Sequence, residues 1–237
     1  MILWSERTWE EIPGDLAGVA ADRLCADVSR RTGVPVLPTL PYGCSLGHSR
    51  RWPGTIALDP LLLTQLVVQV GTWAHHSGVR RLFLVNAHVT NAAPIRCALE
   101  LLRAMHDDLL VAHIDTATMS ERVRAAHFAD AQDWHANEAE TSLMMAIAPE
   151  LVRPARLADA DDEDRTRDCV FAHLVNRTSR NGVTGAPSRA TRDAGEQLYA
   201  WMVEDLAAIV ARGLREEPPL PQSYGARASV NFMGRET

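Results

Sequence analysis

The stretch RLFLVNAHVTN, at residues 81–91, decides the fold. Its four consecutive apolar residues, 82–85, are typical of a short strand that is buried on both faces of a parallel sheet. Polar residues follow at once, among them His88. Because ligands of open α/β sheets bind beyond the carboxyl ends of the strands, this histidine is predicted to lie at a binding site. The alternative interpretation is that this turn caps the following helix and that its histidine is hydrogen-bonded within the protein and binds no ligand.

Alternating helices and strands surround this strand. Apolar residues at helical spacing predict helices, and short apolar runs predict further strands, before and after it. The predicted helices span residues 15–31, 61–76, 91–105, 138–148 and 192–215, the predicted strands lie at the start of 34–43 and at 108–114, and a less regular helix and loop fill 120–133. This order predicts a three-layer α/β/α fold with a mostly parallel sheet. We expect a single domain over residues 1–237, in which residues 218–237 form a tail or an intersubunit arm.

Composition narrows the possible functions. A formal net charge of -6 does not suit a nucleic-acid-binding protein, and all 24 basic residues are arginine, which excludes a Schiff-base lysine. No apolar run reaches the roughly 18 residues of a membrane span, and the amino terminus lacks the regions of a signal peptide. The four cysteines are widely spaced, as expected of reduced thiols. We therefore expect a cytoplasmic protein with neither nucleic acid nor membrane as a partner.

Three polar segments are candidates for a site: YGCSLGH at residues 42–48, NAHVTN at 86–91 and HANEAETS at 135–142. The first two follow predicted strands, and the third begins a predicted helix. Glu138 and Glu140 are two residues apart and would point about 200° away from each other on a helix. One of them is therefore expected to be structural.

Together these segments resemble the creatininase family of amidohydrolases. That family has an asparagine-glycine-histidine-glycine-glycine-asparagine turn, similar to residues 86–91, and a histidine-alanine-glycine segment that continues into glutamate-threonine-serine, similar to 135–142. Its PYG turn, followed by a histidine and a PGT triplet, is similar to residues 41–55. Its GxxGxPxxAT segment is similar to NGVTGAPSRATRDAG at 181–195. The matches keep the family order along the chain.

The resemblance implies a three-layer α/β subunit, usually assembled into a hexamer, with a two-metal site that hydrolyses a C–N bond. His88 and Glu140 fall on metal-ligand positions, and His135 and His48 fall on positions near the catalytic centre. Further candidates are Glu138 for acid–base chemistry, Cys44 as a nucleophile with His48 four residues away, and Asn86, Asn91, Trp134 and Tyr42 for substrate binding.

The amino-terminal part departs from the family pattern. A glutamate-glutamine-histidine-glycine segment, which supplies one ligand to each metal in the family, is missing. Asp22 matches the bridging aspartate best, and Asp15 is the weaker candidate. Asp22, His88 and Glu140 could hold one divalent cation, zinc or manganese, or the chain could hold no metal. Two glycines of the family turn are Val89 and Thr90 here, which predicts a bulkier pocket floor and a different substrate.

Three functions are consistent with these residues. The first is a metal-dependent C–N hydrolase of a small molecule or peptide, in which Asp22, His88 and Glu140 bind the cation and His135 transfers a proton. The second is a metal-independent enzyme in which the histidines and a glutamate, or Cys44, carry out acid–base or covalent chemistry, including cyclisation or condensation in a biosynthetic pathway. The third is a non-catalytic partner subunit, which keeps the oligomeric assembly of the family but not its reaction.

Overall fold

A computed structural model describes residues 2–4 and 16–220. Three parallel strands, β1 (Ile2–Trp4), β2 (Arg81–Asn86) and β3 (Leu110–Asp115), form a sheet in the order β1-β2-β3. The register pairs Leu84 with His113 and Asn86 with Asp115. β2 is therefore the central strand of the described sheet, as its continuous apolar run predicts.

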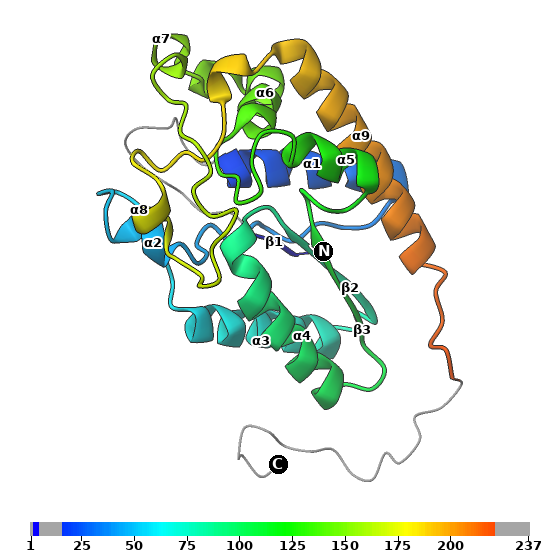
Figure 1. Cartoon of the computed structure of the whole chain (residues 1–237). Helices are drawn as coiled ribbons and strands as arrows, with labels where there is room; N and C mark the ends of the chain where they lie inside the picture. The colour runs from blue at the N-terminus through cyan, green and yellow to red at the C-terminus, as the bar shows by residue number, and fades with distance from the viewer. Residues whose placement is uncertain (1, 5–15, 221–237) are drawn as a thin grey trace.

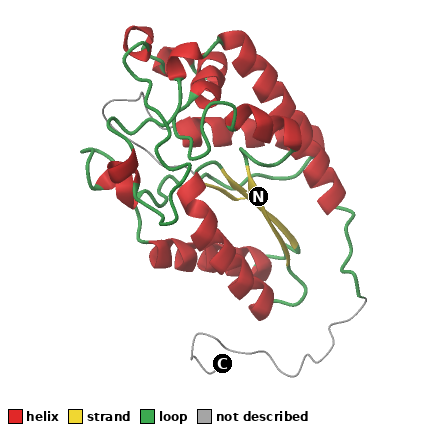
Figure 2. Ribbon diagram, in the orientation of Figure 1, coloured by secondary structure: helices red, strands yellow, loops and turns green. Residues whose placement is uncertain are grey.

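Helices cover both faces of this sheet (Figures 1 and 2). α3 (Pro60–His76) and α4 (Ala92–Met105) pack on one face. α1 (Leu16–Thr32), α6 (Glu138–Ile147) and α9 (Arg192–Gly213) pack on the other. This arrangement confirms the predicted three-layer α/β/α fold.

Short helices and turns connect these elements. They are α2 (Leu46–Ser49), η1 (Val89–Asn91), α5 (Glu121–His127), η2 (Pro149–Leu151), α7 (Pro154–Leu157), α8 (Val175–Thr178) and η3 (Pro187–Arg189). Although α2 and α8 are far apart in the sequence, they contact each other beside the carboxyl end of β2 (Figure 1). Among the helices of the described residues, none is long and apolar enough to cross a membrane.

Successive side chains of β2 point to opposite faces of the sheet. Phe83 and Val85 enter the hydrophobic core beneath α1, α6 and α9. Leu82 and Leu84 enter the core formed with α3 and α4. Because both faces of the sheet are covered, residues 82–85 are all apolar. The next polar residue, Asn86, ends the strand.

Side-chain caps set the start of the main helices. Asp59 accepts a hydrogen bond from the backbone N–H of Leu61 at 2.8 Å and is followed by proline at the first position of α3. Asn137 accepts from the N–H of Glu140 at 3.1 Å and begins α6. The start of α6 matters for the site, because the segment before it carries His135.

A glycine allows α9 to approach α6 closely. Gly195 faces the backbone of Ser142, and a Cβ built on the glycine would overlap the carbonyl oxygen of that residue. The Ser142 hydroxyl also accepts a hydrogen bond from the N–H of Thr191 at 3.0 Å. The first turn of α9 is thus joined to the middle of α6.

The strand predicted at the start of residues 34–43 is wrong. This segment is irregular, apart from an isolated bridge residue at Leu40. Prolines at positions 35, 38 and 41 have no N–H to donate, so the segment cannot form a regular ladder. β1, which was not predicted, pairs with β2 instead. Asp15 and residues 221–237 of the predicted tail lie outside the described residues.

Candidate active site

The turn after β2 is held in place by Asn86. Its side-chain oxygen accepts from the N–H of His88 at 3.2 Å. Its Nδ2 donates to the carbonyl of His88 at 2.9 Å and to the carboxylate of Asp115 at 2.6 Å. These bonds fix the backbone of His88 at the carboxyl edge of the sheet, where the sequence predicts it.

Asn91 joins this turn to the segment at residues 42–48. The Asn91 side-chain oxygen accepts from the N–H of Cys44 at 2.7 Å, and the Thr90 hydroxyl donates to the carbonyl of Cys44. Asn86 and Asn91 therefore bind neighbouring backbone, and the described lining of the cavity includes neither of them. The described contacts of both asparagines are thus supporting ones, and a contact with substrate stays a prediction.

A cavity of about 220 Å³ lies between α2, α8 and the turn after β2. Its lining contains three predicted histidines, His48, His88 and His135, together with Cys44 and Trp134. Polar residues that were not predicted as site residues also line it, among them Ser45, Asp133 and His173. The three polar sequence segments thus converge on one cavity.

His135 lies at the centre of the histidine cluster. Its ring centroid is 4.2 Å from that of His48 and 6.0 Å from that of His88. Its Nδ1 lies 2.6 Å from the carbonyl oxygen of Gly182. Because a carbonyl can only accept, Nδ1 carries the proton and Nε2 keeps its lone pair when the ring is neutral. Burial, together with His48 and His88, holds the pKa of His135 well below its usual value, so the ring is neutral at pH 7.

His48 is also neutral at pH 7. Burial is the main cause, and with the neighbouring His88 it lowers the pKa of His48 to about 4, while the carbonyl of Gly182 acts in the opposite direction. The Nδ1 of His48 lies 2.7 Å from the hydroxyl oxygen of Ser45. The cluster therefore offers uncharged imidazole nitrogens that can accept protons.

Glu140 lies beside this cluster at the start of α6. Its carboxylate accepts from the N–H of Ala136 at 2.6 Å. Burial raises the pKa of Glu140, and the Ala136 N–H and His88 oppose that rise. Ala136 has a φ of 49°, in the left-handed region, and this bend lets the chain fold back from His135 onto the helix.

The cation site predicted from Asp22, His88 and Glu140 is not assembled by the described residues. Asp22 is exposed on α1, and its carboxylate accepts from the hydroxyl of Thr39. Across residues 2–4 and 16–220, no group of three or more His, Cys, Asp or Glu side chains is arranged to hold a metal ion. The donors present in the described part of the chain therefore do not fit the three-ligand cation site.

Two other predicted site residues lie away from the cavity. The carboxylate of Glu138 faces Arg189 at 3.6 Å. Tyr42 is exposed. Neither belongs to the described lining of the cavity. Glu138 and Glu140 are two residues apart on a helix and therefore point in different directions. As predicted, only one of them, Glu140, faces the histidines.

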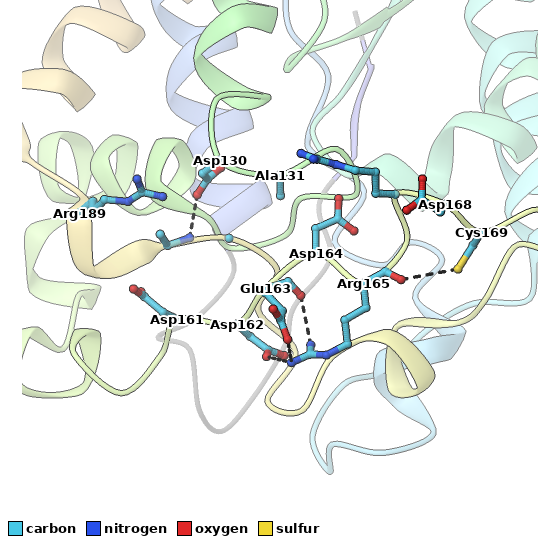
Figure 3. A pocket seen from close by; sticks show the side chains of 13 residues that line it. Asp130, Ala131, Asp161, Asp162, Glu163, Asp164, Arg165, Asp168, Cys169 and Arg189 are labelled. Carbon is cyan, nitrogen blue, oxygen red and sulfur yellow. Dashed lines mark hydrogen bonds and ion pairs between the residues drawn. The ribbon is translucent and has the colours of Figure 1, made fainter.

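Asp130 positions the segment that carries His135. It accepts from the Nδ2 of Asn137 at 2.7 Å. It also accepts from the N–H of Ala186 at 2.8 Å, a bond that Figure 3 draws. The backbones of His135 and Thr184 also form an antiparallel bridge. The loop at residues 181–187 is thus fastened to the start of α6, and this explains how Gly182 reaches the imidazole of His135.

The acidic stretch at residues 159–168 surrounds a second, open hollow (Figure 3). Although this stretch is rich in charged residues, Asp162 is buried. Asp162 accepts from Arg165 at 2.7 Å, from the Ser179 hydroxyl at 3.0 Å and from the N–H of Arg180 at 2.8 Å. This carboxylate therefore joins the acidic loop to the segment after α8.

The fold and the cavity define a class of protein: a three-layer α/β/α protein with a histidine-rich pocket at the carboxyl end of its central strand. Within that class, the chain belongs to the creatininase family. The family profile, described as creatinine amidohydrolase, matches residues 17–210.

Two curated relatives support this assignment. The chain is 29% identical over 211 residues to the creatinine amidohydrolase of Pseudomonas putida, covering 83% of this chain and 80% of that protein. It is 32% identical over 184 residues to the mycofactocin precursor peptide peptidase of Mycobacterium tuberculosis, covering 74% of this chain and 64% of the peptidase. The chain thus spans just under two thirds of the length of that peptidase.

Solved structures of creatininases share the fold. A crystal structure of creatinine amidohydrolase superposes with a TM-score of 0.75, at 25% identity and 91% coverage of both chains. A manganese creatininase gives a TM-score of 0.73, at 26% identity and 91% coverage of both chains. A mutant creatininase described as being of the Zn-Zn type gives 0.74.

Proposed function

We propose that this protein hydrolyses an amide or cyclic amide C–N bond of a small molecule or a peptide. The observation that carries this proposal is the convergence of His48, His88 and His135 on one cavity. The named activities of the relatives, an amidohydrolase and a peptide peptidase, favour the same type of bond.

His135 is the general base in this proposal. Its Nδ1–H is held by the carbonyl of Gly182, so its Nε2 is the nitrogen that can take a proton from the attacking nucleophile. Because its pKa is lowered, the ring is already in the accepting form at pH 7. A positioned base of this kind contributes roughly 100- to 10,000-fold to a rate.

His48 then supplies the proton that the departing nitrogen requires. With ring centroids only 4.2 Å apart, His48 and His135 disfavour double protonation, because each positive charge lowers the pKa of the other ring. The pair therefore carries a single proton at a time. That property suits a transfer from the nucleophile to the leaving nitrogen across one cavity.

The donor geometry favours a metal-independent version of this reaction. The sequence predicts a single cation held by Asp22, His88 and Glu140, but Asp22 is exposed and engaged by Thr39, and the weaker candidate Asp15 lies outside the described residues. No step of the proposed mechanism therefore uses a metal. Glu140 instead lies close enough to His88 for its carboxylate to be influenced by that ring.

Catalysis explains the cavity better than a purely structural role does. Buried imidazoles that must remain neutral reduce stability wherever the unfolded chain would bind protons. A subunit that only supported a partner would gain nothing from placing three of them around a hollow. We therefore favour the enzyme over the non-catalytic partner subunit.

Cleavage of an amide or cyclic amide substrate tests this proposal. The purified protein would be incubated with creatinine and with a panel of short peptides; ring opening of creatinine would be followed by chromatography of the product, and peptide cleavage by the appearance of new primary amines. We expect cleavage of at least one compound by the wild type, with loss of turnover in His135→Ala and His48→Ala. His76→Ala is the matched control, because His76 is exposed at the end of α3. Equal turnover in all four proteins, or no cleavage of any compound, would refute the proposal.

A further inference from the structure

A serine and a histidine share a short hydrogen bond inside the cavity. The hydroxyl oxygen of Ser45 lies 2.7 Å from the Nδ1 of His48. Both residues line the 220 Å³ cavity, and their exposed fractions are 1% for Ser45 and 7% for His48. A hydroxyl within hydrogen-bond reach of a neutral imidazole is the arrangement of a nucleophile and its base.

The position of Ser45 in the chain makes this contact informative. Ser45 is the residue that precedes α2, where a serine hydroxyl normally bonds to the backbone N–H of the first helical turn. In the described structure of α2 its side chain makes no such capping bond. The hydroxyl is instead directed to the imidazole three residues later.

The role of a base requires the tautomer of His48 that carries its proton on Nε2. The hydrogen bond printed for this ring is the one between Nδ1 and the Ser45 hydroxyl, while its buried Nε2 has no hydrogen-bond partner among the described residues. With the proton on Nε2, Nδ1 is the acceptor for the hydroxyl hydrogen of Ser45.

We propose that Ser45 is a catalytic nucleophile activated by His48, and that amide cleavage passes through an acyl ester on the Ser45 oxygen. This inference rests on the proposed amide hydrolysis and assigns its attacking atom. In the first half-reaction the attacking atom is then the Ser45 oxygen with His48 as its base, and in the second it is water with His135 as its base.

The atoms balance in two steps. First, the Ser45 oxygen forms a bond to the substrate carbonyl carbon while its proton passes to Nδ1 of His48. The tetrahedral adduct then collapses, the C–N bond breaks, and the leaving nitrogen takes that proton and departs as an amine. Second, water gives a proton to an imidazole and adds to the ester carbon. The C–O bond to Ser45 breaks, Ser45 regains a proton, and a carboxylic acid leaves.

The neighbouring thiol is the competing nucleophile. Cys44 also lines the cavity and precedes Ser45 directly. The geometry favours the hydroxyl, because the 2.7 Å contact to His48 Nδ1 is made by Ser45. Chemical labelling separates the two atoms without any knowledge of the natural substrate.

A fluorophosphonate probe tests this assignment. The full-length protein would be treated with the fluorescent probe, and the modified peptide would be located by mass spectrometry. We expect an adduct on Ser45, with labelling lost in Ser45→Ala and His48→Ala. Ser49→Ala, which changes a half-buried serine at the other end of α2, should label like the wild type. Circular dichroism would establish that each variant is folded.

The outcomes separate this inference from the proposed function. An adduct on Cys44, or no adduct on the wild type, would overturn the role of Ser45 even if an amide substrate is cleaved. So would full amide turnover by folded Ser45→Ala. An adduct on Ser45 that depends on His48 would support the inference, even if none of the tested amides proves to be a substrate. Because the adduct is located on the wild-type protein, the test holds even if Ser45→Ala fails to fold.

Discussion

The Nδ1 of His135 lies 2.6 Å from the carbonyl oxygen of Gly182, which is 47 residues further along the chain. This bond fixes the tautomer of the histidine and leaves Nε2 as the accepting nitrogen. Gly182 belongs to the NGVTGAP segment, one of the stretches that resemble the family pattern. The role of that segment at the site is therefore to orient an imidazole rather than to contribute a charged side chain.

Replacing His135 with glutamine should abolish most of the amide turnover. Glutamine keeps a hydrogen-bond donor for Gly182 but cannot accept a proton at pH 7, so we expect a loss of roughly 100- to 10,000-fold in kcat. The measurement is the initial rate on an amide that the wild type cleaves. Retention of more than about a tenth of the wild-type kcat would show that another group is the base.

Removal of metal should leave turnover unchanged. The carboxylate of Asp22 is exposed and accepts from Thr39, and the described residues contain no three-ligand site. The protein would be dialysed against a strong chelator, and its metal content and amide turnover would be measured together. Stoichiometric zinc or manganese, with activity that disappears on chelation and returns on adding the ion, would contradict this expectation.

His127 should make the protein less stable in acid. Burial lowers the pKa of His127 to about 4, whereas the unfolded chain titrates near 6.5. Between these two values the unfolded state binds more protons, so the free energy of unfolding falls as the pH drops from 6.5 to 4. The difference between the two pKa values corresponds to a decrease of at most about 3 kcal/mol in the free energy of unfolding. Urea unfolding of the wild type at several pH values measures it.

The variant His127→Leu provides the control for that experiment. Leucine fills the buried site without a titrating group, so its free energy of unfolding should depend less on pH across the same range. Identical pH dependence in the variant and the wild type would show that other groups cause the acid sensitivity. His48 and His135 have lowered pKa values too and should account for part of the remaining slope.

Replacing Asp162 with alanine should destabilise the protein. The substitution leaves the Arg180 N–H without its acceptor and removes one partner of the Ser179 hydroxyl, which keeps the carbonyl of Val183, and this costs about 1 to 3 kcal/mol. The midpoint of thermal unfolding should fall accordingly. Asp168→Ala is the matched control from the same loop, since Asp168 is exposed and should change stability by less than about 0.5 kcal/mol. Equal midpoints for the two variants would contradict the structural role of Asp162.

The close approach of α9 to α6 predicts that Gly195→Ala is destabilising. In an isolated helix alanine would be favoured by about 1 kcal/mol. Here the added methyl group overlaps the carbonyl of Ser142, and overpacking of this kind typically costs 1 to 3 kcal/mol. Chemical denaturation should show a lower free energy of unfolding than in the wild type. Increased stability would mean that the two helices separate without cost.

The sequence is informative about the fold wherever periodicity is strong. Residues 82–85 predict a two-sided central strand, and the long helices follow from apolar spacing. Apolar content alone does not predict a strand where backbone hydrogen bonds are missing. Residues 34–43 are apolar enough for a strand, but their prolines have no N–H group to donate. β1 has only three residues, too few to show a period, so its pairing with β2 could not be predicted.

The site was predictable in its segments but not in all its side chains. His48, His88 and His135 follow from the three polar stretches, and the structure brings them together. The direction of a side chain depends on its partners in the folded chain, so the sequence does not reveal that Asn86 and Asn91 bind backbone groups. His173 lies in a loop with no pattern at all. Ser45 has a local signal in the sequence, its spacing of three residues from His48 within YGCSLGH.

The bonds from Asn91 and Thr90 to the backbone of Cys44 bear on how this protein could be redesigned. They hold the turn at residues 86–91 and the segment at residues 42–48 in a fixed arrangement. A substitution at Thr90 or Asn91 would therefore displace several reactive groups at once. Mutant libraries that aim at a new substrate specificity should therefore keep Thr90 and Asn91 unchanged. They should diversify His173 and Leu174, which also line the cavity.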